Sequence, residues 1–231
     1  MRMKEEKRGE DRELVQKIFS DPAALEEKFR HYAGLMAYYR CAMMEIETKF
    51  NVLNEEFSLR YDRNPIQDIR SRLKTPGSIF RKLQKKGLEL NADSIEENLS
   101  DVAGVRVICS FLADVYLLAD ALLSQDDITL IERKDYIAHP KENGYRSLHL
   151  IVTVPIFLAQ EKRLMKVEIQ LRTISMDSWA SLEHQLCYKK DAAFTERMKA
   201  DLFHCATLSA ELDVKMDDLR KMANIDQPQS K

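Results

Sequence analysis

The feature that most constrains the fold is an alternation of strand-like and helical segments in the middle of the chain. β-Branched and other apolar residues with strand character occur in four short segments, at residues 102–111, 128–132, 147–154 and 165–173. Helical spacing predicts helices over residues 113–123 and 174–189. We therefore predict an α/β (α+β) fold in which helices flank a mixed central β-sheet.

Two apolar stripes predict a long helix on each side of this core. Across residues 25–57 the apolar positions recur at alternating steps of four and three, which is heptad spacing, and residues 194–219 are nearly as regular. One sheet can cover only part of two such helices, and uncovered rows would exceed the apolar surface that a monomer usually exposes. We predict a homo-oligomer assembled through these terminal helices. The alternative is that the two helices bury each other within one chain.

These patterns divide the 231 residues into three segments. We predict an N-terminal helical extension over residues 1–65, a central domain over 66–190, and a C-terminal helix with a polar tail over 191–231.

Composition excludes several functional classes. The chain has six glycines, no two closer than ten residues, so it contains neither a GxxxxGK phosphate loop nor a GxGxxG dinucleotide motif. Its 36 basic and 38 acidic residues nearly cancel, so no global field indicates a nucleic-acid-binding protein. No apolar stretch reaches the roughly 18 residues of a membrane span. Any phosphate chemistry must therefore depend on side chains.

Cysteine usage predicts a reducing compartment. Cys41, Cys109, Cys187 and Cys205 show no metal-ligand or CxxC spacing, and no signal peptide precedes them. We expect reduced, buried thiols in a cytoplasmic protein.

The segment from residue 60 to 86 is strongly cationic, with nine basic residues, two acidic ones and a net charge of +7. Arg70, Arg72 and Lys74 alternate along an extended stretch and would share one face of a strand. After a turn, Ser78 is predicted to begin and cap a helix that also carries Lys82, Lys85 and further basic residues. This arrangement suits an anion site, but a solvated basic surface is an equally simple interpretation.

Two acidic residues, Asp101 and Glu168, interrupt otherwise apolar strands. Strand periodicity places Glu168, Gln170 and Arg172 on one face. A carboxylate on a strand face is costly unless it is paired or binds a cation. Two converging carboxylates suit Mg²⁺, which combines few carboxylates with phosphate oxygens. The alternative is a set of ordinary ion pairs, Asp101 with Arg106 and Glu168 with Arg172 or Lys166.

The loop over residues 139–149 places an aromatic residue beside a glycine. Tyr145 could present its ring to a base, and Lys141, Arg146 and His149 could reach phosphates. The alternative is a hairpin-like turn in which Tyr145 fills the core.

Taken in order, these pieces form a recognisable pattern. It resembles the RelA/SpoT-type alarmone synthetase family, and within it the small single-domain members, over about residues 66–190. The matching motifs are Arg72-x-Lys74, Ser78-Ile79-x-x-Lys82, Asp101-x-x-Gly104-x-Arg106, Gly144-Tyr145-Arg146-Ser147-x-His149, Glu168-Ile169-Gln170-x-Arg172-Thr173 and Trp179-Ala180-x-x-Glu183-His184-x-x-x-Tyr188-Lys189.

The resemblance implies a nucleotidyltransferase-like fold and a reaction. Pyrophosphate would move from ATP to the ribose 3′-hydroxyl of GDP or GTP, giving ppGpp or pppGpp and AMP. By similarity, Asp101 and Glu168 would bind Mg²⁺, and Glu168 would also accept the 3′-hydroxyl proton. The ATP-binding residues would be Arg72, Lys74, Ser78, Lys82, Lys85 and Arg106.

For the acceptor, the resemblance implies that Tyr145 stacks on guanine. The other guanine-nucleotide-binding residues would be Lys141, His149, Gln170 and Asp177. Asp177 replaces an asparagine that some small synthetases carry near the guanine, which leaves the choice among GDP, GTP and GMP open. The resemblance also implies a tetramer and allows regulation by product or RNA.

Two other interpretations remain at this stage. One is a related nucleotidyltransferase or pyrophosphokinase with another acceptor. The other is a catalytically silent regulator that binds nucleotides or RNA. The presence of both Asp101 and Glu168 favours an enzyme, because a silent homologue would be expected to have lost one of them.

Overall fold

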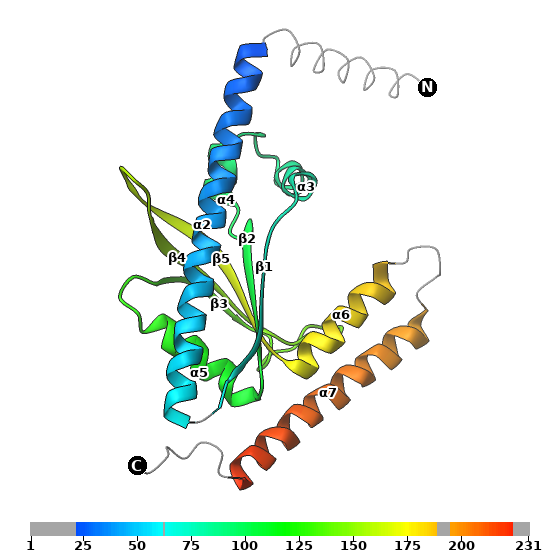
Figure 1. Cartoon of the computed structure of the whole chain (residues 1–231). Helices are drawn as coiled ribbons and strands as arrows, with labels where there is room; N and C mark the ends of the chain where they lie inside the picture. Colours follow the sequence, from blue (N-terminus) through cyan, green and yellow to red (C-terminus); the bar gives the residue numbers. More distant parts are fainter. Residues whose placement is uncertain (1–21, 62, 189–194, 224–231) are drawn as a thin grey trace. The chain divides into compact units, whose positions relative to one another are not determined.

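The computed structural model describes residues 22–61, 63–188 and 195–223 (Figure 1). In chain order its elements are α2 (Pro22–Tyr61), β1 (Ile66–Leu73), α3 (Pro76–Lys86), α4 (Ala92–Asn98), β2 (Ala103–Cys109), α5 (Leu112–Leu123), β3 (Thr129–Asp135), β4 (Leu148–Phe157), β5 (Lys162–Thr173), α6 (Ile174–Tyr188) and α7 (Glu196–Met222). None of the helices in these ranges combines the length and apolarity needed to cross a bilayer.

The five strands form one mixed sheet in the order β1-β2-β5-β4-β3. Strands β2 and β5 are parallel, and the other three neighbouring pairs are antiparallel. The predicted fold class is confirmed, and each predicted strand and helix has a counterpart. Helix α4, which the sequence analysis missed, has only seven residues and so shows almost no periodicity; the Asn91 side chain caps it by accepting from the Ser94 amide.

Contacts divide the chain into two compact units. One comprises the described residues up to Tyr38 together with Thr75–Leu99, and the other comprises Tyr39–Lys74 together with the described residues from Ser100 onward. We call them the helical unit and the sheet unit. The segment boundaries predicted at 65/66 and 190/191 are not tested by this division and stay predictions.

In the helical unit, α3 and α4 contact each other. Ile79 and Leu83 of α3 and Ile95 of α4 are buried, and the Lys86 ammonium donates to the Asn98 carbonyl. The expectation that Ser78 begins and caps α3 is wrong. Thr75 occupies the N-cap position, and Ser78 lies within the first turn.

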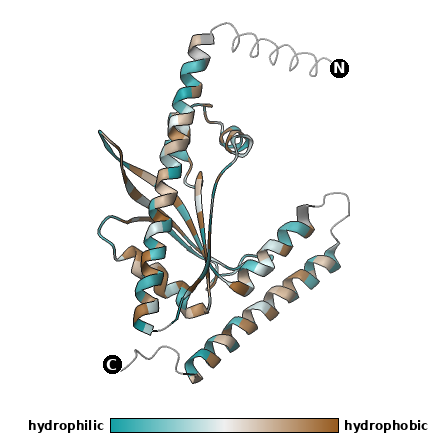
Figure 2. Ribbon diagram, in the orientation of Figure 1, coloured by the Kyte–Doolittle hydropathy of each residue, from teal (hydrophilic) through white to brown (hydrophobic). Residues whose placement is uncertain are grey.

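In the sheet unit, the core lies between the apolar faces of the central strands and helix α5. Figure 2 shows apolar residues concentrated along these strands and on α5. The fully buried side chains include Val107, Leu118, Leu122, Leu150, Ile169 and Leu171. Alternation along β5 thus leaves Glu168 and Gln170 on the opposite face, as predicted.

The apolar stripe of α2 is covered within the chain. Its residues from Met36 to Phe57 are at most 8% exposed, and Tyr39, Ile46 and Phe50 are almost fully buried. Within the sheet unit, the Lys49 ammonium lies 2.7 Å from Asp127, and the Asn54 side chain accepts from the Ile66 amide. The expectation that much of this stripe is uncovered is therefore wrong from Met36 to Phe57, whereas Phe29, nearer the start of the helix, is 71% exposed.

The stripe of α7 is exposed instead. Met198, Leu208, Leu212, Met216 and Leu219 are 40–56% exposed, so the idea that the two stripes bury each other is also wrong for the described residues. Phe194, at the start of the predicted stripe, lies outside those residues. Polar contacts connect α7 to the rest of the sheet unit. Asp213 accepts from Ser175 and Arg146, and Asp217 accepts from the Ala113 amide.

Two of the thiols differ from the expectation that all are buried. Cys109 is buried, and desolvation raises the pKa of its thiol, whereas Cys41 is partly exposed and Cys205 is exposed. These three are free thiols, and the side chain of Cys187 lies outside the described residues.

One buried ion pair fixes the start of α5. Asp114 is fully buried, and its two carboxylate oxygens lie 2.7 and 2.9 Å from the guanidinium nitrogens of Arg63. The same carboxylate accepts from the Phe111 amide at the helix start.

We predict that Asp114→Ala lowers the free energy of unfolding by about 3–5 kcal/mol, because it removes the carboxylate that balances a buried cation. Urea denaturation at pH 7 measures this change. The matched control is Asp127→Ala, which removes a more exposed partner of Lys49 and should cost about 1 kcal/mol or less. Equal losses would contradict the prediction.

Candidate active site

A polar pocket lies on the sheet unit, with a volume of about 230 Å³. It is lined by Arg70, Ser71, Arg72, Lys74, Asp101, Gly104, Val105, Arg106, Glu168 and Gln170. The structure thus brings together the sequence-predicted residues Arg72, Lys74, Asp101, Arg106, Glu168 and Gln170.

Strand register explains this grouping. Arg70, Arg106, Gln170 and His149 lie opposite one another across four strands, in a single row. Directly opposed residues in a sheet point to the same face, so the row presents its polar groups together. The neighbouring row runs from Arg72 through Gly104 to Glu168. Because Gly104 has no side chain, the space between Arg72 and Glu168 stays open.

Asp101 lies at the entry to β2 and pairs with Lys74, whose ammonium is 2.5 Å from its carboxylate. The Lys74 amide also donates to the Val102 carbonyl, which extends the pairing of β1 and β2 by one residue. The alternative pairing of Asp101 with Arg106 does not occur, because Arg106 binds Asp177.

Glu168 contacts His149 and Gln170. Its carboxylate lies 3.5 Å from His149 Nδ1 and accepts from Gln170 Nε2 at 3.1 Å. Burial by itself would raise the pKa of the Glu168 carboxyl, but the hydrogen bonds from His149 and Gln170 outweigh it and the pKa lies below its ordinary value. Glu168 is therefore ionised at neutral pH, as a metal ligand or a general base must be.

The carboxylates of this pocket fit a substrate-held cation better than a permanent metal site. Among the described residues, no group of three or more His, Cys, Asp or Glu side chains could hold a metal ion. Asp101 and Glu168 line the same pocket and interact electrostatically. Two carboxylates completed by water and phosphate oxygens form a donor set that Mg²⁺ accepts.

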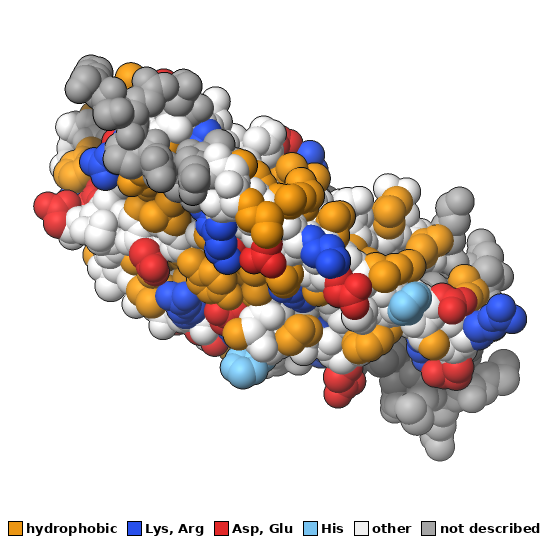
Figure 3. All heavy atoms as spheres, turned by 90° about the horizontal axis from the view of Figure 1, so that it is seen from below, with side chains coloured by type: hydrophobic (Ala, Val, Ile, Leu, Met, Phe, Trp, Pro, Cys, Tyr) orange, Lys and Arg blue, Asp and Glu red, His pale blue; other side chains and the backbone are white. Residues whose placement is uncertain are grey.

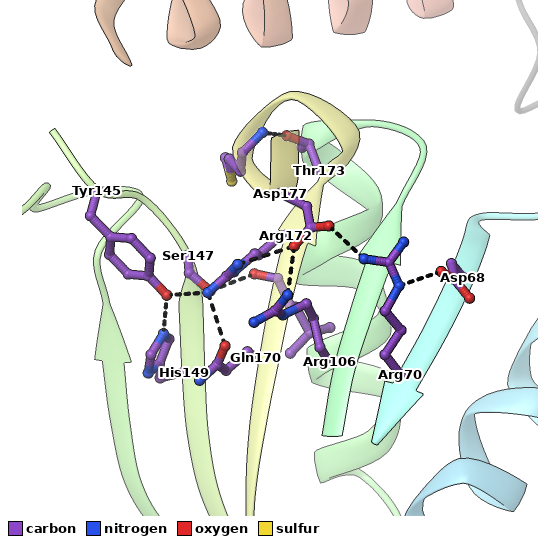
Figure 4. A network of polar contacts seen from close by, with 12 residues as sticks. Asp68, Arg70, Arg106, Tyr145, Ser147, His149, Gln170, Arg172, Thr173 and Asp177 are labelled. Atoms are coloured by element: carbon purple, nitrogen blue, oxygen red, sulfur yellow. Dashed lines mark hydrogen bonds and ion pairs between the residues drawn. The ribbon is translucent and has the colours of Figure 1, made fainter. Parts of the chain in front are cut away.

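Polar contacts join Glu168 to the loop that carries Tyr145 in a closed ring. Figure 4 shows the part of this ring from His149 through Tyr145 and Arg172 to Gln170. The Tyr145 hydroxyl lies 2.8 Å from His149 Nε2 and accepts from Arg172 at 2.7 Å. Arg172 also donates to Gln170 Oε1 at 2.9 Å, and Gln170 Nε2 donates to the Glu168 carboxylate. The ring fixes four polar side chains around the ionised Glu168.

The aromatic ring of Tyr145 is half-buried. It is thus neither fully presented to a base nor fully part of the core, the two interpretations that the sequence left open. It packs against a small cluster formed by Trp179, Ala180 and Ala206. The Lys141 ammonium lies 4.9 Å from its centroid and 4.6 Å from that of Tyr136. Part of the ring thus belongs to the core, while a cation and a second aromatic residue border the rest.

Asp177, in the first turn of α6, is only 6% exposed. One carboxylate oxygen lies 3.1 Å from Arg106 and 3.1 Å from Arg172, and the other lies 3.1 Å from Arg70. Both oxygens are thus occupied by guanidinium groups in this structure.

The remaining predicted ATP ligands, Ser78, Lys82 and Lys85, lie on α3 in the helical unit. The Ser78 hydroxyl accepts from Thr75 Oγ1 at 2.9 Å and from Arg81 at 3.3 Å. Their assignment stays a prediction.

Arg70, Arg172 and Tyr136 receive no individual role in the site from the sequence. For Arg70 and Arg172 the signal is strand periodicity, which places Arg70 on the face of Arg72 and Arg172 on the face of Glu168. Tyr136 had none, because its contact with Lys141 depends on how the loop folds back.

A mixed sheet with carboxylates, arginines and a lysine gathered on one face is suited to a protein that binds phosphorylated ligands. Residues 71–193 match the family model described as "Region found in RelA / SpoT proteins". The chain belongs to the RelA/SpoT family.

Some relatives within this family match the chain over most of their own length. The chain is 41% identical to the GTP pyrophosphokinase YwaC of Bacillus subtilis over 79% of this chain and 87% of that protein. It matches the crystal structure of small alarmone synthetase 2 from Bacillus subtilis with a TM-score of 0.74 and 39% identity, over 81% of this chain and 97% of that one.

Small alarmone synthetase 1 from the same organism matches in two complexes. The structure bound to its product pppGpp has a TM-score of 0.72 and 34% identity, over 80% of this chain and 93% of that one. The structure bound to AMPCPP has a TM-score of 0.71 and 29% identity, over 84% of this chain and 98% of that one.

The loop before β4 depends on a close backbone approach to α7. Gly144 has a φ of 88°, and a Cβ added to it would lie 2.5 Å from the Cβ of Ala206. We predict that Gly144→Ala lowers the free energy of unfolding by about 1–3 kcal/mol through backbone strain and this clash.

Urea denaturation tests this prediction. The double variant Gly144→Ala/Ala206→Gly should lose less free energy of unfolding than the two single variants lose in sum. The second change relieves the clash but not the backbone strain. Gly34→Ala in α2, where a Cβ meets nothing within 4 Å, is the matched control and should not lose stability. A Gly144→Ala variant as stable as this control would contradict the prediction.

Proposed function

We propose that the chain is a small alarmone synthetase that transfers pyrophosphate from ATP to the ribose 3′-hydroxyl of GDP or GTP. The observation that carries the proposal is the pocket in which cationic side chains and two carboxylates meet on one sheet face, in a member of the RelA/SpoT family. We place this activity in the cytoplasm, where both nucleotides are available.

Arg72, Lys74 and Arg106 supply the positive charge for the ATP side. In phosphoryl transfer most of the catalysis is positioning and charge stabilisation, which cations fixed on a rigid sheet provide. We assign Arg72 and Arg106 to the adenine and Lys74 to the phosphates. By resemblance to the family, we also assign Ser78, Lys82 and Lys85 of α3 to the ATP phosphates.

The acceptor side is assigned to Tyr145 and its neighbours. Guanine would stack on Tyr145, with Lys141, His149 and Gln170 near the nucleotide. Glu168 would accept the 3′-hydroxyl proton as the ribose oxygen forms its bond to the β-phosphorus of ATP. The bond between that phosphorus and the oxygen bridging to the α-phosphate breaks, and AMP leaves.

Asp101 and Glu168 would hold Mg²⁺ together with phosphate oxygens. The ion would neutralise charge on the transferring group. The low pKa of Glu168 supports this assignment, because an ionised carboxylate can bind a cation without first losing a proton.

The test mixes the purified chain and ATP with GDP, GTP or GMP and measures AMP and the 3′-pyrophosphorylated product. We expect both to form in equal amounts, to stop with EDTA and to return with excess Mg²⁺. AMP formed only with a non-guanine acceptor would support another pyrophosphokinase. No transfer to any nucleotide would overturn the proposal.

We predict that Glu168→Gln reduces turnover by at least about 10²–10⁴-fold, the usual effect of losing a general base, while nucleotide binding partly survives. Initial rates and titrations measure the two effects. Glu161→Gln, at an exposed position in the turn before β5, is the control and should retain activity. A Glu168→Gln enzyme with more than about a tenth of wild-type turnover would contradict the role.

We predict that Tyr145→Ala weakens binding of the guanine nucleotide far more than binding of ATP. Base stacking on an aromatic ring is worth about 1–3 kcal/mol, or about 5- to 150-fold in affinity. Each nucleotide is titrated alone. Tyr145→Phe keeps the ring and separates stacking from the hydroxyl contacts with Arg172 and His149. Equal losses for both nucleotides would instead indicate a purely structural tyrosine.

We also propose a homo-oligomer, a tetramer by family resemblance, which uses the exposed face of α6 and α7. Figure 3 shows apolar side chains gathered on the lower side of the molecule, among charged ones. The described residues of this face line a pocket of about 570 Å³ that includes Trp179, Leu182, Leu208, Leu212 and Met216. Since the α2 stripe is buried from Met36 to Phe57, we retain the C-terminal part of the original prediction.

We predict a mass well above 26.9 kDa by light scattering at micromolar concentration. Leu212→Glu with Met216→Glu should shift the protein to smaller species, because a charge buried at an interface is strongly unfavourable. Leu59→Glu, on an exposed part of α2, is the matched control. A wild-type monomer would contradict the oligomer.

A further inference from the structure

Asp177 occupies an unusual electrostatic position for an acceptor-contacting residue. It is almost completely buried in the first turn of α6, at the end of the sheet face that carries the pocket (Figure 4). Its carboxylate is contacted by three arginines, each at 3.1 Å. These contacts use three of the about four acceptor positions that a carboxylate offers.

The three arginines belong to different parts of the site. Arg106 is one of the residues that we assign to ATP, and Arg70 lines the same pocket. Arg172 instead donates to the Tyr145 hydroxyl, and its guanidinium carbon lies 5.2 Å from the centroid of that ring. Asp177 Oδ1 is shared between Arg106 and Arg172, so this single oxygen links the pocket to the loop that carries Tyr145.

The positive charges of the three arginines require an anion between them. Burial lowers the pKa of Arg106, the nearby Arg172 lowers it further, and Asp177 acts in the opposite direction. Three guanidinium groups would repel one another in this partly buried space without an anion among them. An asparagine could keep some hydrogen bonds but could not balance the charge.

We propose that Asp177 is a positioning residue that couples the ATP and guanine-nucleotide subsites through the oxygen it shares between Arg106 and Arg172. When ATP binds, any change in the contact between Arg106 and this oxygen changes how strongly the oxygen holds Arg172, and with it Tyr145. By thermodynamic reciprocity, guanine-nucleotide binding affects ATP binding by the same factor. The inference rests on the proposed function, which assigns the two subsites.

The experiment measures the affinity for GDP with and without a saturating, non-transferable ATP analogue. In wild-type protein we expect the two affinities to differ by about 5- to 150-fold, the usual range of coupling between sites. In Asp177→Asn the ratio should move toward one by at least about fivefold. The reciprocal titration, of the analogue with and without GDP, should give the same ratio.

Two further variants keep the test decisive. Arg172→Lys retains the charge but replaces the guanidinium fork with one ammonium, which cannot hold Asp177, Gln170 and Tyr145 together, so it should lose coupling too. Asp68→Asn removes the other carboxylate of Arg70, 2.7 Å away, and leaves the shared oxygen intact. This matched control should keep the wild-type ratio.

Three results would overturn the inference. The first is a wild-type ratio of one. The second is an Asp177→Asn variant that loses GDP affinity in the absence of the analogue but keeps the ratio, which indicates direct contact with guanine. The third is a loss of both affinities and of thermal stability with the ratio unchanged, which indicates a merely structural carboxylate. Because no turnover is involved, a failure of AMP release would reject the proposed reaction and leave the coupling measurement valid.

Discussion

The parallel pairing of β2 with β5 is the constraint on which the site depends. It places Gly104 beside Glu168 and Arg106 beside Gln170, and the antiparallel pairing of β1 then adds Arg72 and Arg70 to the same two rows. A shift of one residue in either pairing would move these polar groups to the apolar face. The buried valines, isoleucines and leucines on that face therefore specify the register, and the register assembles the site.

Much of this architecture follows from local patterns. Alternation within β5 predicts which face carries Glu168, and alternation before the turn at 75–77 predicts that Arg72 and Lys74 lie together. Period-two alternation is sufficient for β2 and β5, because each of these strands has a face of buried apolar residues. The assignment of Arg72 and Arg106 to adenine, and of Asp177 to the guanine nucleotide, comes from family resemblance, which carries information that spacing does not.

The remaining features depend on contacts between distant residues. Nothing near Asp177 in the sequence indicates three arginine partners, two of which lie 71 and 107 positions away. Burial of the α2 stripe was equally hidden, because a heptad pattern shows that a helix has a partner but not whether the partner is a sheet or another subunit. Sequence periodicity reports the existence of a buried face, and only tertiary structure identifies what covers it.

Helix α7 has a consequence for how the protein can be handled. Its inner side contacts the loop at Gly144 and supports Trp179, whose indole nitrogen donates to the Leu202 carbonyl. All five strands precede it, so a chain truncated after α6 would retain the whole sheet. Such a fragment would nevertheless lack the support behind Tyr145. Affinity tags, fusion partners and domain boundaries for expression should therefore be placed beyond residue 223 rather than at the end of the sheet.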